Sequence, residues 1–332
     1  MSNGNNSTDD GCYHILGMSG KQLPENAIHI AYGVDGKFIR ALCTSIASVV
    51  KNTDSIVIAH VFSNAFEAMF SPLQQLSSQL NVIILLHPVD VKKFDGWATE
   101  GWSSAIYQRL VMAPVLSIFS SRFIYLDADV LCTGDISPLF SLDLHGNIVA
   151  AVEDPDKSGH SFDKSGYSCA HYFNSGVLLI DTAAWNKNAI TDSLYNLLAE
   201  KSYEFRSYDQ DALNIVLDGR VEIMAPAYNY PADTNQHIIV EDYKRDNPIK
   251  HPVLKHFMGG NKPWVEGVEG DGSDVEQYLH YEQFTPFKGK ARQCPTTRRE
   301  AKVCARYMIK NKKYGAGLYW FFNYVVMKFS NK

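Results

Sequence analysis

The first 130 residues alternate between short apolar runs and longer segments in which apolar residues recur at helical spacing. Unbroken apolar runs favour buried strands, and a 3.6-residue period favours helices with one buried face. Near-continuous apolar strands separated by helices are typical of a parallel α/β sheet covered on both faces. This pattern predicts strands at residues 28–32, 55–62, 81–89 and 122–130, and helices at residues 37–52, 67–80 (interrupted early by Pro72) and 103–117.

The second half of the chain is less regular, and we find no internal repeat in it. The same criteria predict strands at residues 147–154 and 172–181, a short strand within residues 252–264, helices at residues 182–201 and 209–218, and a loop at residues 225–236. We therefore expect a single α/β domain from residue 28 to residue 266. A polar leader (residues 1–27) would precede it. A linker and a basic, aromatic C-terminal helical region would follow it (residues 267–332).

Charge is distributed unevenly along the chain. The formal net charge is −5, yet residues 288–332 contain twelve Lys and Arg against one acid, Glu300. Tyr, Trp and Phe residues lie among these cations, a combination that suits an anionic membrane surface. Simple packing of a C-terminal helix on the domain is the alternative. No recognised nucleic-acid module accompanies the basic region, so a nucleic-acid partner is not expected.

Cysteine use and the N-terminal residues indicate a cytoplasmic protein. The six cysteines are scattered and form no CxxC pair, which is typical of reduced thiols rather than of a disulfide framework. The first twelve residues lack the basic and apolar segments of a signal peptide. No apolar run approaches the roughly 20 residues that a membrane-spanning helix needs.

Two carboxylates, Asp127 and Asp129, follow the apolar run at residues 122–126. In an extended segment residues i and i+2 point the same way, and open α/β sheets bind ligands at the carboxyl ends of their strands. Two such charges repel each other unless a cation lies between them. Mg²⁺ and Mn²⁺ accept carboxylates together with substrate phosphates, so the pair indicates a divalent metal site. The alternative is a pair of solvated loop acids.

A second polar segment, residues 256–264, offers complementary chemistry. His256 can be a third metal ligand, Gly259 and Gly260 allow close approach of the backbone to a phosphate, and Lys262 can neutralise that phosphate. Each of these residues alone is ordinary in a surface loop. Together with the acid pair they indicate a metal-bound diphosphate.

Six motifs follow one another along the chain: AYGVDGKF (31–38), AIYQRL (105–110), YLDADV (125–130), YFNSGVLLID (172–181), DQDALN (209–214) and HFMGGNKPW (256–264). In this order they resemble family 8 glycosyltransferases of the GT-A (Rossmann-like) fold, most closely the bacterial lipopolysaccharide core α-glucosyl- and α-galactosyltransferases. The resemblance covers about residues 28–264. It implies retaining transfer of a hexose from a UDP-sugar to a lipid-linked oligosaccharide at the cytoplasmic face of the bacterial inner membrane.

The resemblance also implies roles for individual residues. A divalent cation, Mn²⁺ or Mg²⁺, would be held by Asp127, Asp129 and His256. The UDP-sugar would contact Gly33, Asp35, Lys37, Arg109, Asp127, Ala128, Asp129, Gly259 and Lys262, with the Asp35 carboxylate accepting from the uracil N3–H. The residues near the sugar and its anomeric carbon would be Arg109, Asp154, Asn174, Asp209 and Gln210.

Several of these residues have simpler explanations. Asp35 can cap the helix that follows it, Asp209 can be a first-turn acid, and Arg109 can extend from the edge of an amphipathic helix. The chain also departs from the family pattern at Gly36, where a second polar residue is usual, and at Val265, where relatives often have His. The second departure bears on the acceptor side.

Retention of configuration requires either a covalent glycosyl-enzyme or attack on the same face as the leaving group. No acid is assigned here as a nucleophile, and same-face attack with UDP as the base is the favoured hypothesis. Two alternatives are a haloacid-dehalogenase-like Mg²⁺-dependent phosphatase and a non-catalytic glycan- or lipid-binding relative. The first usually carries its Asp-x-Asp near the start of the domain, whereas about 120 residues precede it here.

Overall fold

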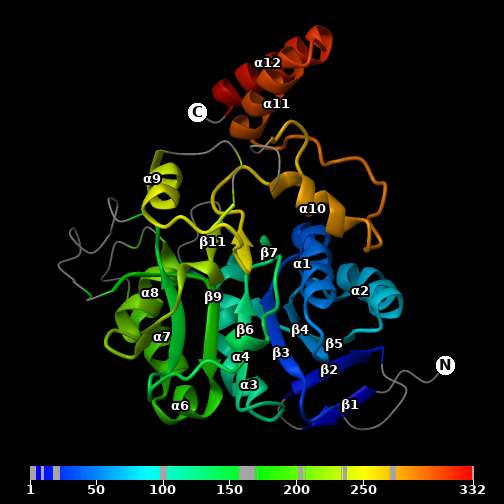
Figure 1. The fold of residues 1–332 in the computed structure, drawn as a ribbon. Coiled ribbons are helices and arrows are strands. Elements are labelled where there is room, and N and C mark those ends of the chain that lie inside the picture. Colours follow the sequence, from blue (N-terminus) through cyan, green and yellow to red (C-terminus); the bar gives the residue numbers. More distant parts are fainter. Residues whose placement is uncertain are drawn as a thin grey trace.

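The computed structural model describes residues 5–8, 11–17, 23–97, 103–156, 169, 171–200, 205, 207–232, 234, 238–269 and 274–330. In this part of the chain a nine-stranded sheet has the order β1-β2-β5-β4-β3-β6-β9-β8-β10. Only β2 and β9 run against the other strands, so most of the sheet points one way (Figure 1). The strands are β1 (Asn5–Thr8), β2 (Gly11–Leu16), β3 (Ile28–Gly33), β4 (Val57–Ser63), β5 (Ile83–Pro88), β6 (Arg122–Leu126), β8 (Val149–Glu153), β9 (Phe173–Asp181) and β10 (Val221–Ile223).

A second, three-stranded sheet continues directly from the carboxyl end of β6. It has the order β11 (Tyr230–Pro231), β12 (Leu254–His256) and β7 (Val130–Cys132). Because β7 follows β6 after only three residues and pairs antiparallel with β12, His256 lies opposite Val130. This pairing brings two of the predicted motifs together.

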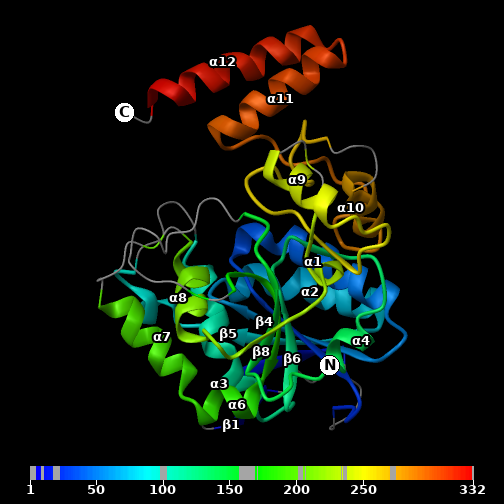
Figure 2. The same cartoon turned by 60° about the vertical axis from the view of Figure 1, so that its left-hand side comes forward.

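Helices cover both faces of the large sheet, as the apolar strands require (Figure 2). One face packs on α1 (Ile39–Asn52), α2 (Phe66–Leu80) and α4 (Ser137–Phe140). The other packs on short helical segments: η2 (Val91–Phe94), η3 (Ser104–Val111), α3 (Met112–Leu116), α6 (Thr182–Lys187), α7 (Ile190–Ala199) and α8 (Tyr208–Val216). The remaining segments are η1 (Gly36–Phe38), η4 (Pro226–Tyr228), α9 (Ile238–Asp246), α10 (Asp274–Glu282), α11 (Arg298–Lys310) and α12 (Tyr314–Ser330).

Three helix predictions need correction. Pro72 does not interrupt α2, because the burial of Met69, Leu73 and Leu76 outweighs the loss of one backbone hydrogen bond. The helix predicted at residues 182–201 is two helices, since Ala189 has a left-handed conformation (φ 49°) between α6 and α7.

The helix predicted at residues 103–117 is a 3-10 helix, η3, followed by α3. Pro114 cannot donate a backbone hydrogen bond, and it lies in the first turn of α3, where none is needed. The carbonyl of Leu110 accepts from the Thr191 hydroxyl instead (2.8 Å). The α-helical hydrogen-bond pattern therefore starts only at Met112.

The leader and the linker also differ from their predictions. Within the leader, β2 pairs antiparallel with β5, and Leu16 is buried. Within the predicted linker, α10 packs on α1, and Glu282 forms a buried ion pair with Arg40 (2.6 Å). The described parts of both segments thus belong to the fold, while the domain limits stay predictions.

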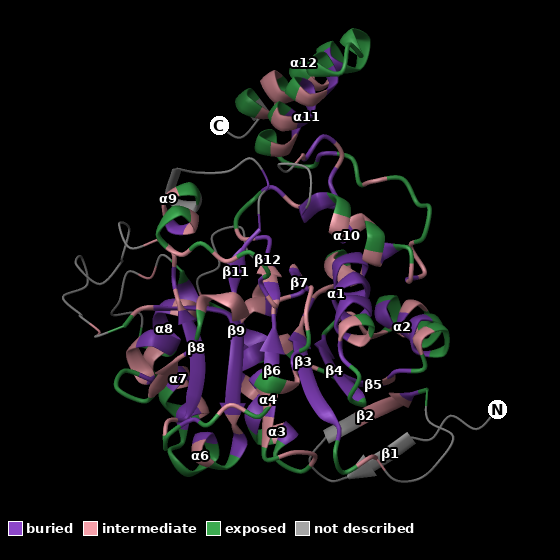
Figure 3. Ribbon diagram, viewed as in Figure 1, coloured by how far each residue is buried: buried purple, intermediate pink, exposed green. Residues whose placement is uncertain are grey.

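The C-terminal helices α11 and α12 form a hairpin at the end of the molecule that is remote from β1 (Figure 1). The basic, aromatic helical appendage expected from the sequence is therefore present. Figure 3 shows that the strands are largely buried, whereas α12 is largely exposed. No described helix is long and apolar enough to cross a membrane.

Candidate functional site

The candidate site lies where β6 ends and the chain turns into β7. The Asp127 N–H donates to the carbonyl of Gly176 on β9 (2.8 Å), and the Val130 N–H donates back to the Asp127 carbonyl (3.0 Å). The Asp129 carbonyl accepts from the N–H of Phe257, the residue after β12 (3.0 Å). Backbone hydrogen bonds therefore hold both acids between the two sheets.

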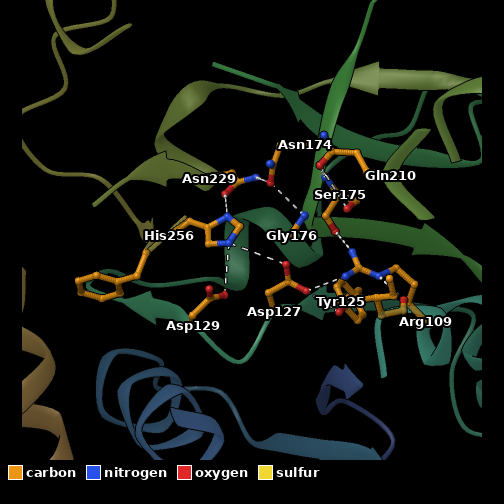
Figure 4. A network of polar contacts seen from close by, with 12 residues as sticks. Arg109, Tyr125, Asp127, Asp129, Asn174, Ser175, Gly176, Gln210, Asn229 and His256 are labelled. Carbon is orange, nitrogen blue, oxygen red and sulfur yellow. Dashed lines mark hydrogen bonds and ion pairs between the residues drawn. The ribbon is translucent and has the colours of Figure 1, made fainter. Parts of the chain in front are cut away.

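Asp127, Asp129 and His256 come together as the sequence predicts (Figure 4). His256 Nε2 lies 3.3 Å from Asp129 Oδ1 and 3.8 Å from Asp127 Oδ2, and one donor atom from each residue fits within 4.8 Å of the others. His256 is buried, and both carboxylates are partly exposed. Two carboxylates and one imidazole are a donor set suited to Mn²⁺ or Mg²⁺, so these residues fit the predicted metal.

Each carboxylate also has a cationic partner from the chain. Arg109 Nη2 contacts Asp127 Oδ1 (2.9 Å), which also accepts from the Tyr125 hydroxyl (2.5 Å). Lys262 Nζ forms an ion pair with Asp129 and donates to the Phe257 carbonyl (2.8 Å). Burial alone would raise the pKa of Asp129, but the positive charge of Lys262 lowers it below its ordinary value. Asp129 is thus held as a carboxylate.

The predicted sugar-binding residues form a second cluster beside the acids. Asp154 Oδ2 accepts from the side-chain amides of Asn174 and Gln210, each at 3.0 Å. Gln210 Oε1 in turn accepts from the Ser175 N–H (3.0 Å). Asp154 directly follows β8, Asn174 lies on β9 and Gln210 lies on α8, and the three side chains meet beside the acid pair.

Arg109 joins this cluster to the acids. Its guanidinium stacks on the Tyr125 ring (4.4 Å), donates to the Ser175 carbonyl (2.6 Å) and lies 3.0 Å from Asp209 Oδ2. Burial raises the pKa of Asp209 to about 6, in spite of the opposing charge of Arg109. The buried guanidinium of Arg109 is therefore the ion-pair partner of both Asp209 and Asp127.

The predicted uridine-loop residues lie at the same edge of the sheet. Gly33 ends β3, which pairs in parallel with β6, and Phe38 packs edge-on against Trp264 (5.9 Å). Asp35 caps η1 by accepting from the Lys37 N–H (2.9 Å), which is the simpler role considered above. Among the described residues, no hydrogen bond or ion pair joins the side chain of Asp35 or Lys37 to the two acids or to His256.

The remaining predicted residues lie in the turns that frame the acids. Ala128 is buried between them, and Gly259 has a positive φ of 76°, which disfavours any side chain there. Neither makes a described hydrogen bond or ion pair with the metal ligands.

Sequence reasoning missed three residues of the site. Gly176 leaves space for the ligands, since a Cβ there would lie 2.2 Å from His256 Cε1. Tyr125 and Asn229 hydrogen-bond Asp127 and His256, respectively. Gly176 and Tyr125 lie inside motifs that the sequence analysis singled out, whereas Asn229 lies in a segment interpreted only as a loop.

The comparisons with known proteins agree with this geometry. The model of glycosyl transferase family 8 matches residues 29–267, and that of the family 8 C-terminal region matches residues 275–328. The chain is similar to a lipopolysaccharide 1,2-glucosyltransferase of Escherichia coli K12 (30% identity, 71% of this chain and 72% of that protein). It is also similar to a lipopolysaccharide 1,3-galactosyltransferase of Salmonella typhimurium (28% identity, 92% and 91%).

The fold is shared with solved glycosyltransferase structures. A crystal structure of the galactosyltransferase LgtC with donor and acceptor sugar analogues superposes with a TM-score of 0.64 at 22% identity, over 78% of this chain and 96% of that one. The fold class predicted from the sequence, GT-A, is thereby confirmed, which argues against a haloacid-dehalogenase-like phosphatase. Because the family model spans most of the chain, including both predicted metal-ligand motifs, the chain belongs to glycosyl transferase family 8.

Proposed function

We propose that this protein transfers a hexose, glucose or galactose, from a UDP-sugar to the growing lipopolysaccharide outer core, with a divalent cation and with retention, forming an α-linkage. The observation that carries the proposal is the meeting of Asp127, Asp129, His256 and Lys262 from segments about 130 residues apart. The similarity to two lipopolysaccharide glycosyltransferases supports the acceptor class.

A cation held by Asp127, Asp129 and His256 would supply electrostatic stabilisation to the departing diphosphate. Lys262, whose ammonium group already reaches Asp129, would add a positive charge beside the same diphosphate. Gly259, in its left-handed conformation, would let the backbone approach the phosphates. Asp35 and Lys37 would contact the uridine from the loop after β3.

Asp154, Asn174 and Gln210 would bind the sugar hydroxyls through the same donors and acceptors that now join them. Arg109 would keep Asp127 and Asp209 in place beside the anomeric carbon. Same-face attack by the acceptor hydroxyl, whose proton passes to the leaving UDP, accounts for retention without an enzyme nucleophile.

The α11–α12 hairpin supports attachment to the membrane that carries such an acceptor. Its exposed apolar side chains and the eight Lys and Arg residues within residues 298–330 match an anionic lipid surface. We propose a peripheral location on the cytoplasmic face of the bacterial inner membrane.

Asp129→Ala tests the proposal. The substitution removes one metal ligand and the partner of Lys262, and we expect cation-dependent transfer from UDP-hexose to fall at least ~100-fold. Asp54→Ala, at an exposed acid away from the site, should transfer at the wild-type rate. Near-normal transfer by Asp129→Ala would rule out the metal assignment, and wild-type protein that binds UDP-sugar without releasing UDP would indicate a non-catalytic relative.

A further inference from the structure

A continuous series of side-chain hydrogen bonds leads from His256 through Asn229 to Asn174 (Figure 4). It continues from Asn174 to the predicted sugar-binding acid, Asp154. His256 Nδ1 lies 2.9 Å from Asn229 Oδ1, and Asn229 Nδ2 donates to Asn174 Oδ1 (2.8 Å). Asn174 Nδ2 then donates to Asp154 Oδ2 (3.0 Å). Asn229 is 1% exposed, so water does not compete for its amide.

The donor and the acceptor of each hydrogen bond in this series can be assigned by starting from Asp154. Asp154 accepts on both carboxylate oxygens: Oδ1 from the Asp156 N–H (2.8 Å), and Oδ2 from Gln210 as well as from Asn174. The Asn174 amide nitrogen must therefore face Asp154. The Gly176 N–H supports the same orientation of the Asn174 amide, because it donates to Asn174 Oδ1 (3.0 Å) and a backbone N–H can only donate.

The orientation of the Asn174 amide determines which nitrogen of the His256 imidazole carries the hydrogen. Since Asn174 presents oxygen to Asn229, the Asn229 nitrogen must face Asn174 and its oxygen must face His256. His256 Nδ1 therefore carries a hydrogen and donates it. In the neutral ring the other nitrogen, Nε2, then has a free lone pair, and Nε2 is the atom that faces Asp127 and Asp129.

We propose that Asn229 is a positioning residue: through its carbonyl oxygen it holds His256 in the tautomer and ring orientation that bind a divalent cation. Asn174 and Asp154 act behind it by fixing the direction of its amide. The inference rests on the proposed metal site and adds a residue that neither the motifs nor the family resemblance indicates. A hydrogen-bond acceptor behind a ligating histidine typically changes metal affinity 10- to 100-fold.

The test is direct titration of the full chain with Mn²⁺ in the absence of sugar nucleotide. The electron paramagnetic resonance signal of free Mn²⁺ measures how much of the metal is bound. Asn229→Leu keeps the approximate volume of the side chain but removes its acceptor, and we expect Mn²⁺ to bind roughly 10- to 100-fold more weakly. Asn229→Asp retains an acceptor and should bind more tightly than Asn229→Leu. Asn52→Leu, which removes a half-buried amide on α1 that also makes hydrogen bonds, should bind as the wild type does.

A second measurement reports the tautomer without any change at Asn229. Imidazole ¹⁵N chemical shifts of the neutral ring, assigned to His256 by its loss in His256→Gln, should show the hydrogen on Nδ1. The opposite tautomer would overturn the inference, as would equal Mn²⁺ affinity of Asn229→Leu and the wild type. A wild-type protein that transfers hexose yet binds no Mn²⁺ would overturn the inference and leave glycosyl transfer standing.

Discussion

The absence of a side chain at Gly176 gives His256 and Asp127 the room that they occupy. A Cβ at this position would lie 2.2 Å from His256 Cε1, 2.7 Å from His256 Nδ1 and 3.0 Å from Asp127 Oδ2. The backbone there is part of β9 and cannot retreat without disturbing the pairing with β6. The imidazole must therefore move if a methyl group is added.

We predict that Gly176→Ala loses Mn²⁺ affinity by at least ~10-fold while the protein still folds, because ligand geometry changes and the core does not. Calorimetric titration with Mn²⁺ and thermal unfolding measure the two effects. Gly134→Ala is the matched control, since its added Cβ would meet only Val253 atoms at 3.5–3.7 Å. Unchanged affinity in Gly176→Ala would mean that His256 is not a ligand.

At the same scale, the sequence predicts the candidate metal ligands but not the residues that hydrogen-bond to them. Asp127, Asp129 and His256 are identifiable because carboxylates and imidazole in recognisable motifs have few other reasons to recur together. Asn229 carries no such signal, because an amide in a loop is common and its role depends on a hydrogen-bond chain that only folding assembles. Asp35 shows a different case: its local cap on η1 is present, and its contact with uridine stays a prediction.

At the scale of elements, three adjacent parallel strands each contribute one buried histidine. His60 on β4 lies 2.9 Å from His29 on β3 and 3.0 Å from His87 on β5, measured between ring nitrogens. Burial lowers the pKa of His29 to about 4 and that of His87 to about 3. Burial, together with the neighbouring His87 and His29, also lowers the pKa of His60 well below its ordinary value. All three are neutral in the folded protein at neutral pH.

These histidines make stability depend on pH. Their pKa values in the fold lie below the ordinary value of 6.5, so the unfolded chain takes up protons first as the pH falls. The stability that the folded protein keeps through these neutral histidines is fully present above about pH 6.5. It is lost as the pH falls from there towards about 4. When the pH is lowered from about 7.5 to about 5, each buried histidine therefore lowers the free energy of unfolding by about 2 kcal/mol.

Urea unfolding of the wild type and His87→Gln at these two pH values measures the effect. The substituted side-chain amide can still hydrogen-bond to His60 but does not titrate, so the loss of stability on acidification should shrink by about 2 kcal/mol. His251→Gln, at an exposed position, should leave the loss unchanged. Equal losses in all three proteins would contradict the buried, neutral state of His87.

The local sequence pattern predicts whether a segment is a helix or a strand more reliably than it predicts where that segment begins and ends. The strands β3, β4, β5, β6, β8 and β9 fall within or beside their predicted ranges because each is an apolar run buried on both faces. The breaks at Ala189 and Met112 and the continuity through Pro72 depend on tertiary packing that the helical period does not contain. The same limitation concealed β2 and α10.

For the whole molecule, the α11–α12 hairpin is the surface that we propose attaches the protein to a membrane. Leu318, Phe322 and Phe329 share one face of α12, at helical spacings of four and seven, and are 67%, 66% and 65% exposed. Lys312, Lys313 and Lys328 flank this face. Apolar burial and attraction to anionic lipid would act there together.

We predict that replacing Leu318, Phe322 and Phe329 by Ser abolishes flotation of the protein with anionic liposomes and leaves the fold intact. Removing residues 288–332 is a poorer test, because Arg40 hydrogen-bonds to the carbonyls of Lys290 and Ala291. Ile118→Ser, at a residue that is 68% exposed on another surface, should float as the wild type does. Equal flotation of the triple variant would exclude α12 as the lipid-binding surface.

We propose that Asp127, Asp129 and His256 hold a cation that binds the diphosphate of a UDP-hexose during transfer to lipopolysaccharide. The most direct measurement incubates the protein with truncated lipopolysaccharide core and UDP-glucose or UDP-galactose, with Mn²⁺ or with a chelator, and determines product mass and anomeric configuration. We predict one added hexose in α-linkage, formed with Mn²⁺ and not with the chelator. Equal transfer in the chelator, or a β-linked product, would contradict the account.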